Sequence, residues 1–354
     1  MAYTDIDDPS AYFQTTLHTG NGSTQSVTNS GNSDLQPDLI WIKSRSEGEQ
    51  HSWTDVIRGT DSQIHSEGTN AQSTATNSVT AFGSDGFSLG ADGLVNKNNI
   101  TYVSWNWKAG TAASGNTSGG TAKAFSSSSN ATAGFSIVKY IGNDHVGHLI
   151  PHGCGAVPSM IIIRQYDATR AWTVYHKSTG NTHYLALNTT AAAADADNVF
   201  NDTTPSSSVF TLADNSIVNS ASGTYIAYCF AEKQGYSKFG KFIGNGNADG
   251  PYIHLGFAPA FIIYKHTTDG HSWIMEDVKR NIAGNGYLNG SASREFYPNA
   301  NNAEGTAGQR FDFLSNGFKI RETSADINES GRVFTYMAFG QSLVGTNNVP
   351  CTAR

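Results

Sequence analysis

The stretch "DHVGHLIPHGCG" (144–155) holds the side chains best suited to metal chemistry, because histidine and cysteine are good ligands for transition metals. His145, His148 and His152 could gather on one loop with Cys154. No second group of such residues completes a tetrahedral set, and the matching stretch "HLGFAP" needs only apolar side chains. We expect no metal here, although the sequence leaves binding by these three histidines open.

Carboxylate pairs are the second candidate, because glycoside hydrolysis needs two acids across a cleft. Glu276, Asp277, Glu295 and Asp312 lie in one part of the chain, but none of them recurs as a pair elsewhere. We therefore read them as surface charges and expect no catalytic residue and no enzyme.

The acidic stretch "DADNVFND" (195–202) could hold calcium through Asp195, Asp197 and Asp202. It lacks the glycine and the terminal glutamate of a calcium-binding loop. The sequence alone does not decide whether these aspartates bind a metal.

Three tryptophans, Trp53, Trp172 and Trp273, occupy equivalent places in similar segments. A tryptophan on the face of a β-sandwich can stack against a sugar ring, which makes a lectin one interpretation. A residue that recurs at one framework position more often packs the core, and we favour that interpretation.

Loop residues that differ between the similar segments are better candidates for a variable ligand surface. The predicted glycan-binding or partner-binding residues include four such loop residues, which are His51, Tyr166, His271 and Tyr297. They also include the three tryptophans Trp53, Trp172 and Trp273.

The elements that must position these residues repeat along the chain. The phrase "PDLIWIK" at Pro37 returns as "PSMIIIR" at Pro158 and as "PAFIIYK" at Pro259. The prolines are separated by 121 and 101 residues, and the three tryptophans by 119 and 101. Such constant offsets indicate internal repeats.

Short alternating strands and glycine-rich turns predict an all-β chain of three tandem antiparallel β-sandwich repeats, of the jelly-roll or concanavalin-A-like kind. The apolar strands that follow the prolines are typical of strands covered on both faces. In "FGSDGFSL" and "FLSNGFKI" we expect two-residue hairpin turns with a positive φ at Gly86 and Gly317.

The predicted domains follow these repeats. They are repeat 1 with a short N-terminal segment (1–110), a Gly/Ser/Thr-rich linker (111–133), repeat 2 (134–235), repeat 3 (236–341) and a C-terminal tail (342–354).

Composition excludes several classes of function. The net charge of −7 and the absence of a basic stripe argue against a nucleic-acid partner. No 18-residue apolar run predicts a membrane span, and the chain opens without the features of a signal peptide. Three cysteines without close spacing predict neither a disulfide framework nor a zinc site, and no cofactor motif is present.

The stretches "PDLIWIKSRS", "GFSIVKYIGN", "GFAPAFIIYK", "SNGFKIR", "YMAFGQS" and "NNVPCTAR" resemble a family of virion proteins from tailed marine phages. These proteins are often labelled as domains of unknown function or as concanavalin-A-like or SPRY-like sandwiches. The resemblance covers nearly the whole chain and includes "GTYIAYCFAEKQGYSKFG" (223–240). It implies a protein made in the host cytoplasm and located in the virion, with other virion proteins as partners. The family carries no catalytic residues to transfer.

Two functions follow from the sequence and the resemblance. The first is a non-enzymatic tail-fibre or appendage adhesin that binds host cell-surface polysaccharide. The second is a capsid or tail decoration protein with a mainly stabilising role. Both functions are compatible with a homo-oligomer, and neither involves insertion into a membrane.

Overall fold

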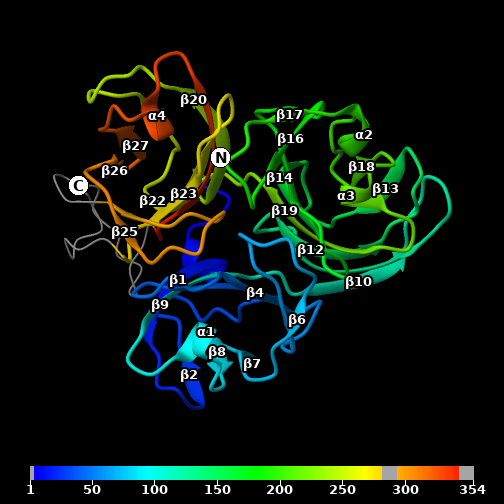
Figure 1. The fold of residues 1–354 in the computed structure, drawn as a ribbon, viewed down its shortest axis with the longest axis horizontal. Coiled ribbons are helices and arrows are strands. Elements are labelled where there is room, and N and C mark those ends of the chain that lie inside the picture. The colour runs from blue at the N-terminus through cyan, green and yellow to red at the C-terminus, as the bar shows by residue number, and fades with distance from the viewer. Residues whose placement is uncertain (1–3, 281–292, 343–354) are drawn as a thin grey trace.

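The computed structural model describes residues 4–280 and 293–342, and these residues form several antiparallel sheets with few helices (Figure 1). The expected all-β class is confirmed. The described helical segments are short: the 3-10 turn η1 (Pro9–Ala11), α1 (Gly93–Asn96), α2 (Asp197–Phe200), α3 (Ser216–Asn219) and α4 (Ala325–Asn328). The sheets gather into three lobes, which we call the first (13–107), second (111–231) and third (237–340) lobe.

The first lobe contains a four-stranded and a three-stranded sheet. The larger has the order β1 (Phe13–Thr19), β9 (Thr101–Trp107), β3 (Leu39–Ser44) and β4 (Ser52–Asp55). The smaller has the order β2 (Gln25–Val27), β8 (Gly86–Leu89) and β7 (Val79–Gly83), and β5 (Ser62–Gln63) pairs with β6 (Ser73–Thr74).

The third lobe has the same order of strands. Its larger sheet runs β20 (Ser237–Ile243), β28 (Val333–Gly340), β22 (Pro259–His266) and β23 (Trp273–Asp277). Its smaller sheet runs β21 (Tyr252–His254), β27 (Gly317–Ile320) and β26 (Phe311–Leu314), and β24 (Arg294–Glu295) pairs with β25 (Gly305–Thr306).

The second lobe extends this arrangement to an eight-stranded sheet. Its order is β10 (Thr111–Asn116), β11 (Ala124–Asn130), β12 (Phe135–Ile141), β19 (Thr224–Ala231), β14 (Pro158–Gln165), β15 (Trp172–His176), β16 (His183–Ala186) and β17 (Ala194–Asp195). The pair β13 (His148–Pro151) and β18 (Val209–Leu212) forms its second sheet.

The segment 111–133, which we expected to be a linker, therefore contributes two strands to the eight-stranded sheet. Strands β10 and β11 form a hairpin, and β11 pairs with β12 from Phe125 to Asn130. Serine and threonine satisfy their backbone groups in this ladder as well as any other residue. The C-terminal tail and Cys351 lie outside the described residues, apart from Ser342.

Each strand that follows a recurring proline is buried on both faces, as its continuous apolar sequence predicts. In β3, Ile40 and Ile42 pack inside the first lobe, whereas Leu39 and Trp41 face a cluster shared by all three lobes. This central cluster contains all six tryptophans of the chain: Trp41, Trp53, Trp105, Trp107, Trp172 and Trp273. Strands β14 and β22 divide their residues between two clusters in the same way.

Equivalent hydrogen bonds close the three lobes into a ring. A backbone N–H of each lobe donates to a carbonyl of the next one: Gln72 to Tyr166 (2.7 Å), Ala193 to Thr267 (2.8 Å) and Glu304 to Arg45 (2.8 Å). Each lobe thus contacts both others, and the strands around the central cluster hold them in fixed positions.

A buried cationic side chain near the end of each of the strands β3, β14 and β22 also connects neighbouring lobes. Lys43, Arg164 and Lys265 are at most 1% exposed. They donate to backbone carbonyls of a neighbouring lobe, which are those of Asn301, Asn70 and Thr190 respectively. Burial lowers the pKa of both lysines to about 8, and for Lys43 it does so against the opposing effects of Glu67 and Glu49.

The two predicted hairpins exist, but their turns differ from the prediction. The strand register places Ser84–Asp85 and Ser315–Asn316 in the two-residue loops. Gly86 has the expected positive φ of 109°, whereas the expectation for Gly317 is wrong, since its φ is not positive. Both glycines allow close approach, because a Cβ would lie 2.0 Å from the Val27 carbonyl oxygen or 2.1 Å from that of Ile253.

Candidate functional site

The three equivalent tryptophans pack the interior. Trp53, Trp172 and Trp273 are at most 2% exposed and belong to the central cluster. The Trp172 Nε1 donates to the His65 carbonyl of the first lobe, and the Trp273 Nε1 donates to the Ala186 carbonyl of the second, each at 2.9 Å. Their burial favours the packing interpretation and leaves no ring face for a sugar.

His51 and Tyr166 are also buried, so the prediction that they form a variable loop surface requires correction. The His51 Nδ1 accepts from the Trp41 Nε1 at 2.8 Å, so its Nε2 carries the proton and faces the Tyr297 and Ala300 carbonyls. Burial holds the pKa of His51 well below its usual value. Local sequence could not show this burial, because a polar residue at a contact between lobes looks the same as one in a solvent-exposed loop.

His271 and Tyr297, the other two predicted residues, are half-buried and both lie in the third lobe. His271 belongs to the one histidine and carboxylate group among the described residues that could surround a metal ion, together with His266 and Glu329. The His266 Nδ1 accepts from two backbone N–H groups, those of Thr268 and Asp269. Its Nε2 therefore carries a proton toward Glu329 (3.3 Å) and offers no free lone pair to a metal.

The histidines of 144–155 do not converge. The His148 ring lies between the Asn219 amide oxygen (2.8 Å) and the Thr117 hydroxyl (2.7 Å). The His152 Nδ1 accepts from the backbone N–H of Cys154, whose own side chain packs in the second lobe. Each ring has a structural role of its own.

Two of the three aspartates considered as calcium ligands share a surface hollow of about 230 Å³. Asp197 and Asp202 line it together with Asp214, whereas Asp195 lies on β17 opposite His183 and does not. The predicted set is thus not brought together as a whole.

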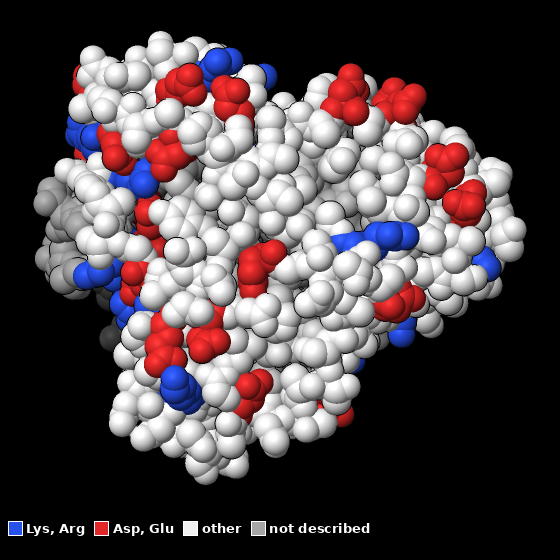
Figure 2. Space-filling model, in the orientation of Figure 1, with Lys and Arg blue, Asp and Glu red and all other residues white. Residues whose placement is uncertain are grey.

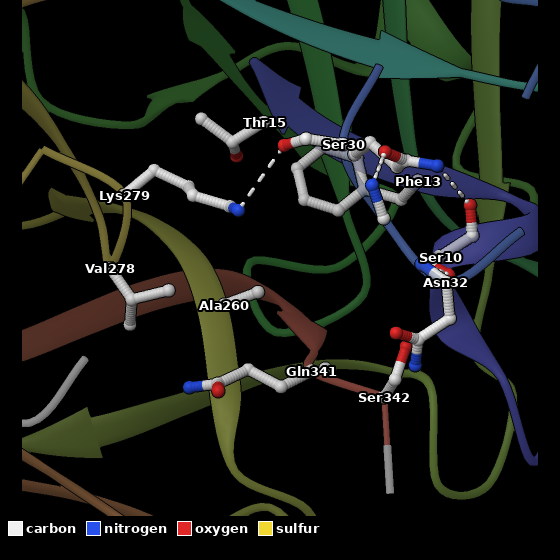
Figure 3. Close-up of a pocket in the computed structure, with 13 residues that line it drawn as sticks. Ser10, Phe13, Thr15, Ser30, Asn32, Ala260, Val278, Lys279, Gln341 and Ser342 are labelled. Carbon is white, nitrogen blue, oxygen red and sulfur yellow. Dashed lines mark hydrogen bonds between the residues drawn. The ribbon is translucent and has the colours of Figure 1, made fainter. Parts of the chain in front are cut away.

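A pocket of about 260 Å³ lies where the first and third lobes meet (Figure 3). Strand β1 and the loop 30–32 form one wall, and β22, the turn after β23 and the end of β28 form the other. Its lining side chains carry mainly hydroxyl and amide groups: Ser10, Gln14, Thr15, Ser30, Asn32, Gln341 and Ser342. Phe13, Ala260 and Val278 supply apolar surface, and Lys279 is the one ionisable lining residue.

Gln14 fixes the loop that forms the first wall. Its amide group donates to the Ser10 and Ser33 carbonyls at 2.9 and 2.8 Å, and its oxygen accepts from the Gly31 N–H at 2.6 Å. Across the pocket, the exposed Lys279 Nζ reaches the Ser30 hydroxyl at 3.4 Å. This long bond leaves the ammonium group most of its capacity for a ligand.

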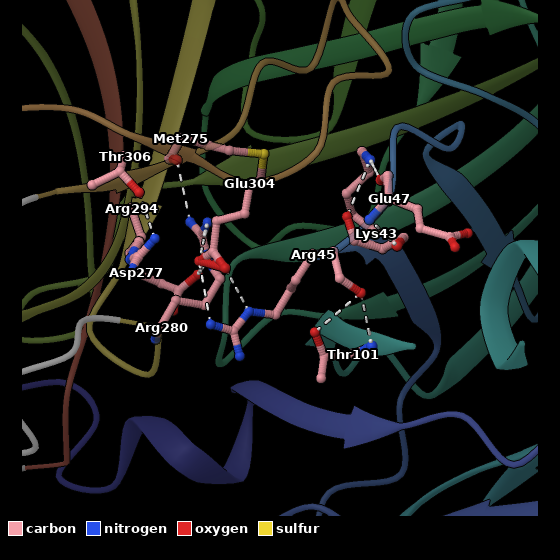
Figure 4. A network of polar contacts seen from close by, with 12 residues as sticks. Lys43, Arg45, Glu47, Thr101, Met275, Asp277, Arg280, Arg294, Glu304 and Thr306 are labelled. Carbon is pink, nitrogen blue, oxygen red and sulfur yellow. Dashed lines mark hydrogen bonds and ion pairs between the residues drawn. The ribbon is translucent and has the colours of Figure 1, made fainter. Parts of the chain in front are cut away.

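A buried network positions the second wall (Figure 4). The Asp277 carboxylate accepts from the Arg280 N–H (3.0 Å), the Arg280 Nε (2.6 Å) and the Trp105 Nε1 of the first lobe (3.0 Å). Arg45 of the first lobe pairs with Glu304 at 2.8 Å, and Glu304 also lies 3.6 Å from Arg280. These contacts close the turn around Val278 and Lys279 and hold Lys279 at the pocket.

Glu276, Asp277, Glu295 and Asp312 are not the surface charges that we expected, because all four are at most 5% exposed. Met275 pairs with Phe296, so Glu276 and Glu295 lie opposite each other on neighbouring strands. Glu295 pairs with Arg310 at 2.7 Å, and Glu276 is fully buried. Burial raises the pKa of Glu276 to about 8, against the opposing effects of Arg310, Ser293 and Arg280, and Glu295 raises it further. Only the strand register shows that Glu276 and Glu295 form a pair, because they are 19 positions apart in sequence.

Charged side chains are scattered over the face shown in Figure 2, and most of that face carries no charge. Among the described residues, no helix is long and apolar enough to cross a membrane.

Comparison with protein families gives one result. The model of a family described as "Domain of unknown function (DUF7483)" matches residues 8–342. A search of curated proteins returns no match.

Proposed function

The chain belongs to the DUF7483 family, and we propose that it is a non-enzymatic carbohydrate-binding protein of a phage virion. In this proposal, the three lobes are tandem antiparallel β-sandwich repeats of the concanavalin-A-like kind. The equivalent strand orders of the first and third lobes and the recurring proline-led strands support the repeat interpretation.

The pocket between the first and third lobes carries the proposal. Hydroxyl and amide side chains can both donate and accept hydrogen bonds, which matches the hydroxyl groups of a sugar. Ala260 and Val278 offer apolar surface to the C–H groups of a sugar ring. At about 260 Å³ the pocket is smaller than the roughly 300–1,000 Å³ that hold drug-sized ligands, so it suits a single sugar unit at a chain end or branch.

The positive charge of Lys279 favours one class of sugar over another as the ligand of this pocket. It is exposed, and no carboxylate lines the pocket beside it. A sugar that carries a carboxylate would therefore gain a charge-assisted hydrogen bond that a neutral sugar lacks.

The same lining residues support a non-enzymatic role. Hydrolysis of a glycosidic bond needs an acid and a second carboxylate at a fixed separation. The pocket residues offer neither a carboxylate nor an imidazole, and Glu276 is buried away from solvent in the third lobe. Binding without cleavage is the chemistry that remains.

The setting in the virion rests on the family resemblance described above. An adhesin there needs only weak single sites, because several linked sites gain affinity through avidity. We place the protein in a tail fibre or similar appendage, with host cell-surface polysaccharide as ligand and other virion proteins as neighbours.

The closed ring of lobes favours a second candidate, a decoration protein that stabilises the capsid or tail. The shared central cluster and the three equivalent backbone bonds suit a rigid building block. Such a protein would need no ligand pocket.

Binding of the purified protein to host cells and to their isolated surface polysaccharide separates these functions. We expect weak binding by the free protein, tighter binding by a clustered form and no release of reducing sugar. Oligosaccharide products would contradict the non-enzymatic role, and absence of binding by the clustered form would favour decoration.

A further inference from the structure

Strand β10 is an unprotected sheet edge. Among the described sheets, the edge strands of five residues or more are β1, β7, β10, β20 and β23. An edge strand presents unpaired backbone N–H and C=O groups, and proteins usually block them by burial, charge or a bulge.

Four of the five are protected. All residues of β23 and the first four of β1 are buried. Strand β7 has a register irregularity between Val79 and Ala81, and β20 carries Lys238 and Lys241. Strand β10, with the sequence "TAASGN", is exposed at every residue, has no charge and pairs with β11 without a shift in register.

We propose that β10 pairs antiparallel with β10 of a second copy of this chain, which joins two eight-stranded sheets across a twofold axis. In such a pair, a residue i of one copy faces a residue j of the other, and j faces i, so equivalent residues lie close together near the twofold axis and like charges there would be destabilising. Strand β10 has only small, uncharged side chains, and so does most of β11 behind it. The strand is therefore complementary to itself, and the contact closes after two copies because it is isologous.

The proposal does not depend on the carbohydrate pocket, which lies in the other two lobes. Sedimentation velocity over a range of concentrations tests it, in about 0.15 M salt so that the repulsion between chains of charge −7 is screened beyond about 8 Å. We expect a reversible monomer–dimer equilibrium. Ala113→Lys should weaken dimerisation at least tenfold, because it places a charge within the paired strands.

Thr132→Lys is the matched control, because it adds the same charge at an exposed residue outside β10. It should leave the equilibrium unchanged. Circular dichroism and thermal melting check that each variant folds, and Thr111→Lys, at the end of the strand, replaces Ala113→Lys if that variant does not fold. Hydrogen exchange of the 111–116 amides should slow as dimer forms.

Three results would overturn the proposal. They are a wild-type protein that stays monomeric at every concentration, a dimer that Ala113→Lys leaves intact, and a dimer that forms without protection of the 111–116 amides. In the first case, an extended peptide of another protein would become the better occupant of this edge.

Discussion

Gly86 and Gly317 show how a single missing side chain determines the spacing between two strands. Each begins the second strand of a hairpin and lies against a carbonyl of the neighbouring edge strand, β2 or β21. The two glycines occupy equivalent positions, although only Gly86 has a positive φ. Close backbone approach, rather than turn conformation, is the requirement that they share.

Gly317→Ala should therefore destabilise the protein by about 1–3 kcal/mol, because the new Cβ would lie 2.1 Å from the Ile253 carbonyl oxygen. Urea denaturation measures the change. Gly308→Ala is the control. Apart from the residues next to it in the chain, no atom would lie within 4 Å of a Cβ at Gly308. Equal stability of the two variants would show that β21 moves away without cost.

Glu276 should make stability depend on pH. Its pKa of about 8 in the folded protein exceeds the ordinary value of 4.5, so the unfolded chain loses this proton first as pH rises. The contribution of Glu276 to the free energy of unfolding thus falls between pH 4.5 and 8 and is constant above that range. Glu276→Gln should remove this slope and stabilise the protein at pH 8 relative to wild type by roughly a few kcal/mol.

Denaturation of wild type and Glu276→Gln at pH 5 and pH 8 measures this difference. Lys43 and Lys265, whose pKa values are about 8, are present in both proteins and cancel in the comparison. Asp61→Asn, at an exposed carboxylate, serves as control. A constant difference between wild type and Glu276→Gln at the two pH values would show that Glu276 is ionised when folded.

At the scale of elements, the β10–β11 hairpin is where composition and structure disagree most. Strand β11 covers the edge of β12, whose Phe135 and Ile137 belong to the central cluster. Replacement of residues 111–130 by a short Gly/Ser connection should expose that edge, lower the melting temperature and promote aggregation. A variant as stable and soluble as wild type would restore the linker interpretation. Light scattering during thermal melting provides the measurement.

The elements that sequence predicts well are those with a strong apolar pattern. The strands after Pro37, Pro158 and Pro259 are found as expected and are buried on both faces. The hairpin at 111–130 has no apolar period, and its strands form because β12 offers a ladder, which local sequence cannot show.

The candidate site is harder to predict for the same reason. Its two walls come from the first and third lobes, and Ser30 and Lys279 are 249 residues apart. Residues chosen by their recurrence, such as Trp53 and Trp273, mark the contacts between lobes instead. Recurring residues indicate what the three lobes have in common, whereas a pocket between two lobes depends on residues that differ among them.

At the scale of the whole molecule, the central cluster makes the three lobes depend on one another. Each lobe contributes a face of its larger sheet, and no lobe could expose that face to water without cost. We expect a single cooperative transition in calorimetry, whereas independent domains would unfold in separate steps. Two or three resolved transitions would contradict the closed ring.

The pocket at one junction gives this rigid body its proposed function, and binding of defined sugars tests that claim most directly. The probe is an array of neutral and uronic-acid-containing oligosaccharides, presented to wild type, Lys279→Gln and Lys241→Gln in clustered form. Lys241 is an exposed lysine on β20 that does not line the pocket, so its variant matches the change in charge. The account predicts binding to uronic-acid-containing chains that falls about tenfold, or about 1.4 kcal/mol, in Lys279→Gln and is unchanged in Lys241→Gln. Absence of binding to every sugar, or equal loss in both variants, would contradict it.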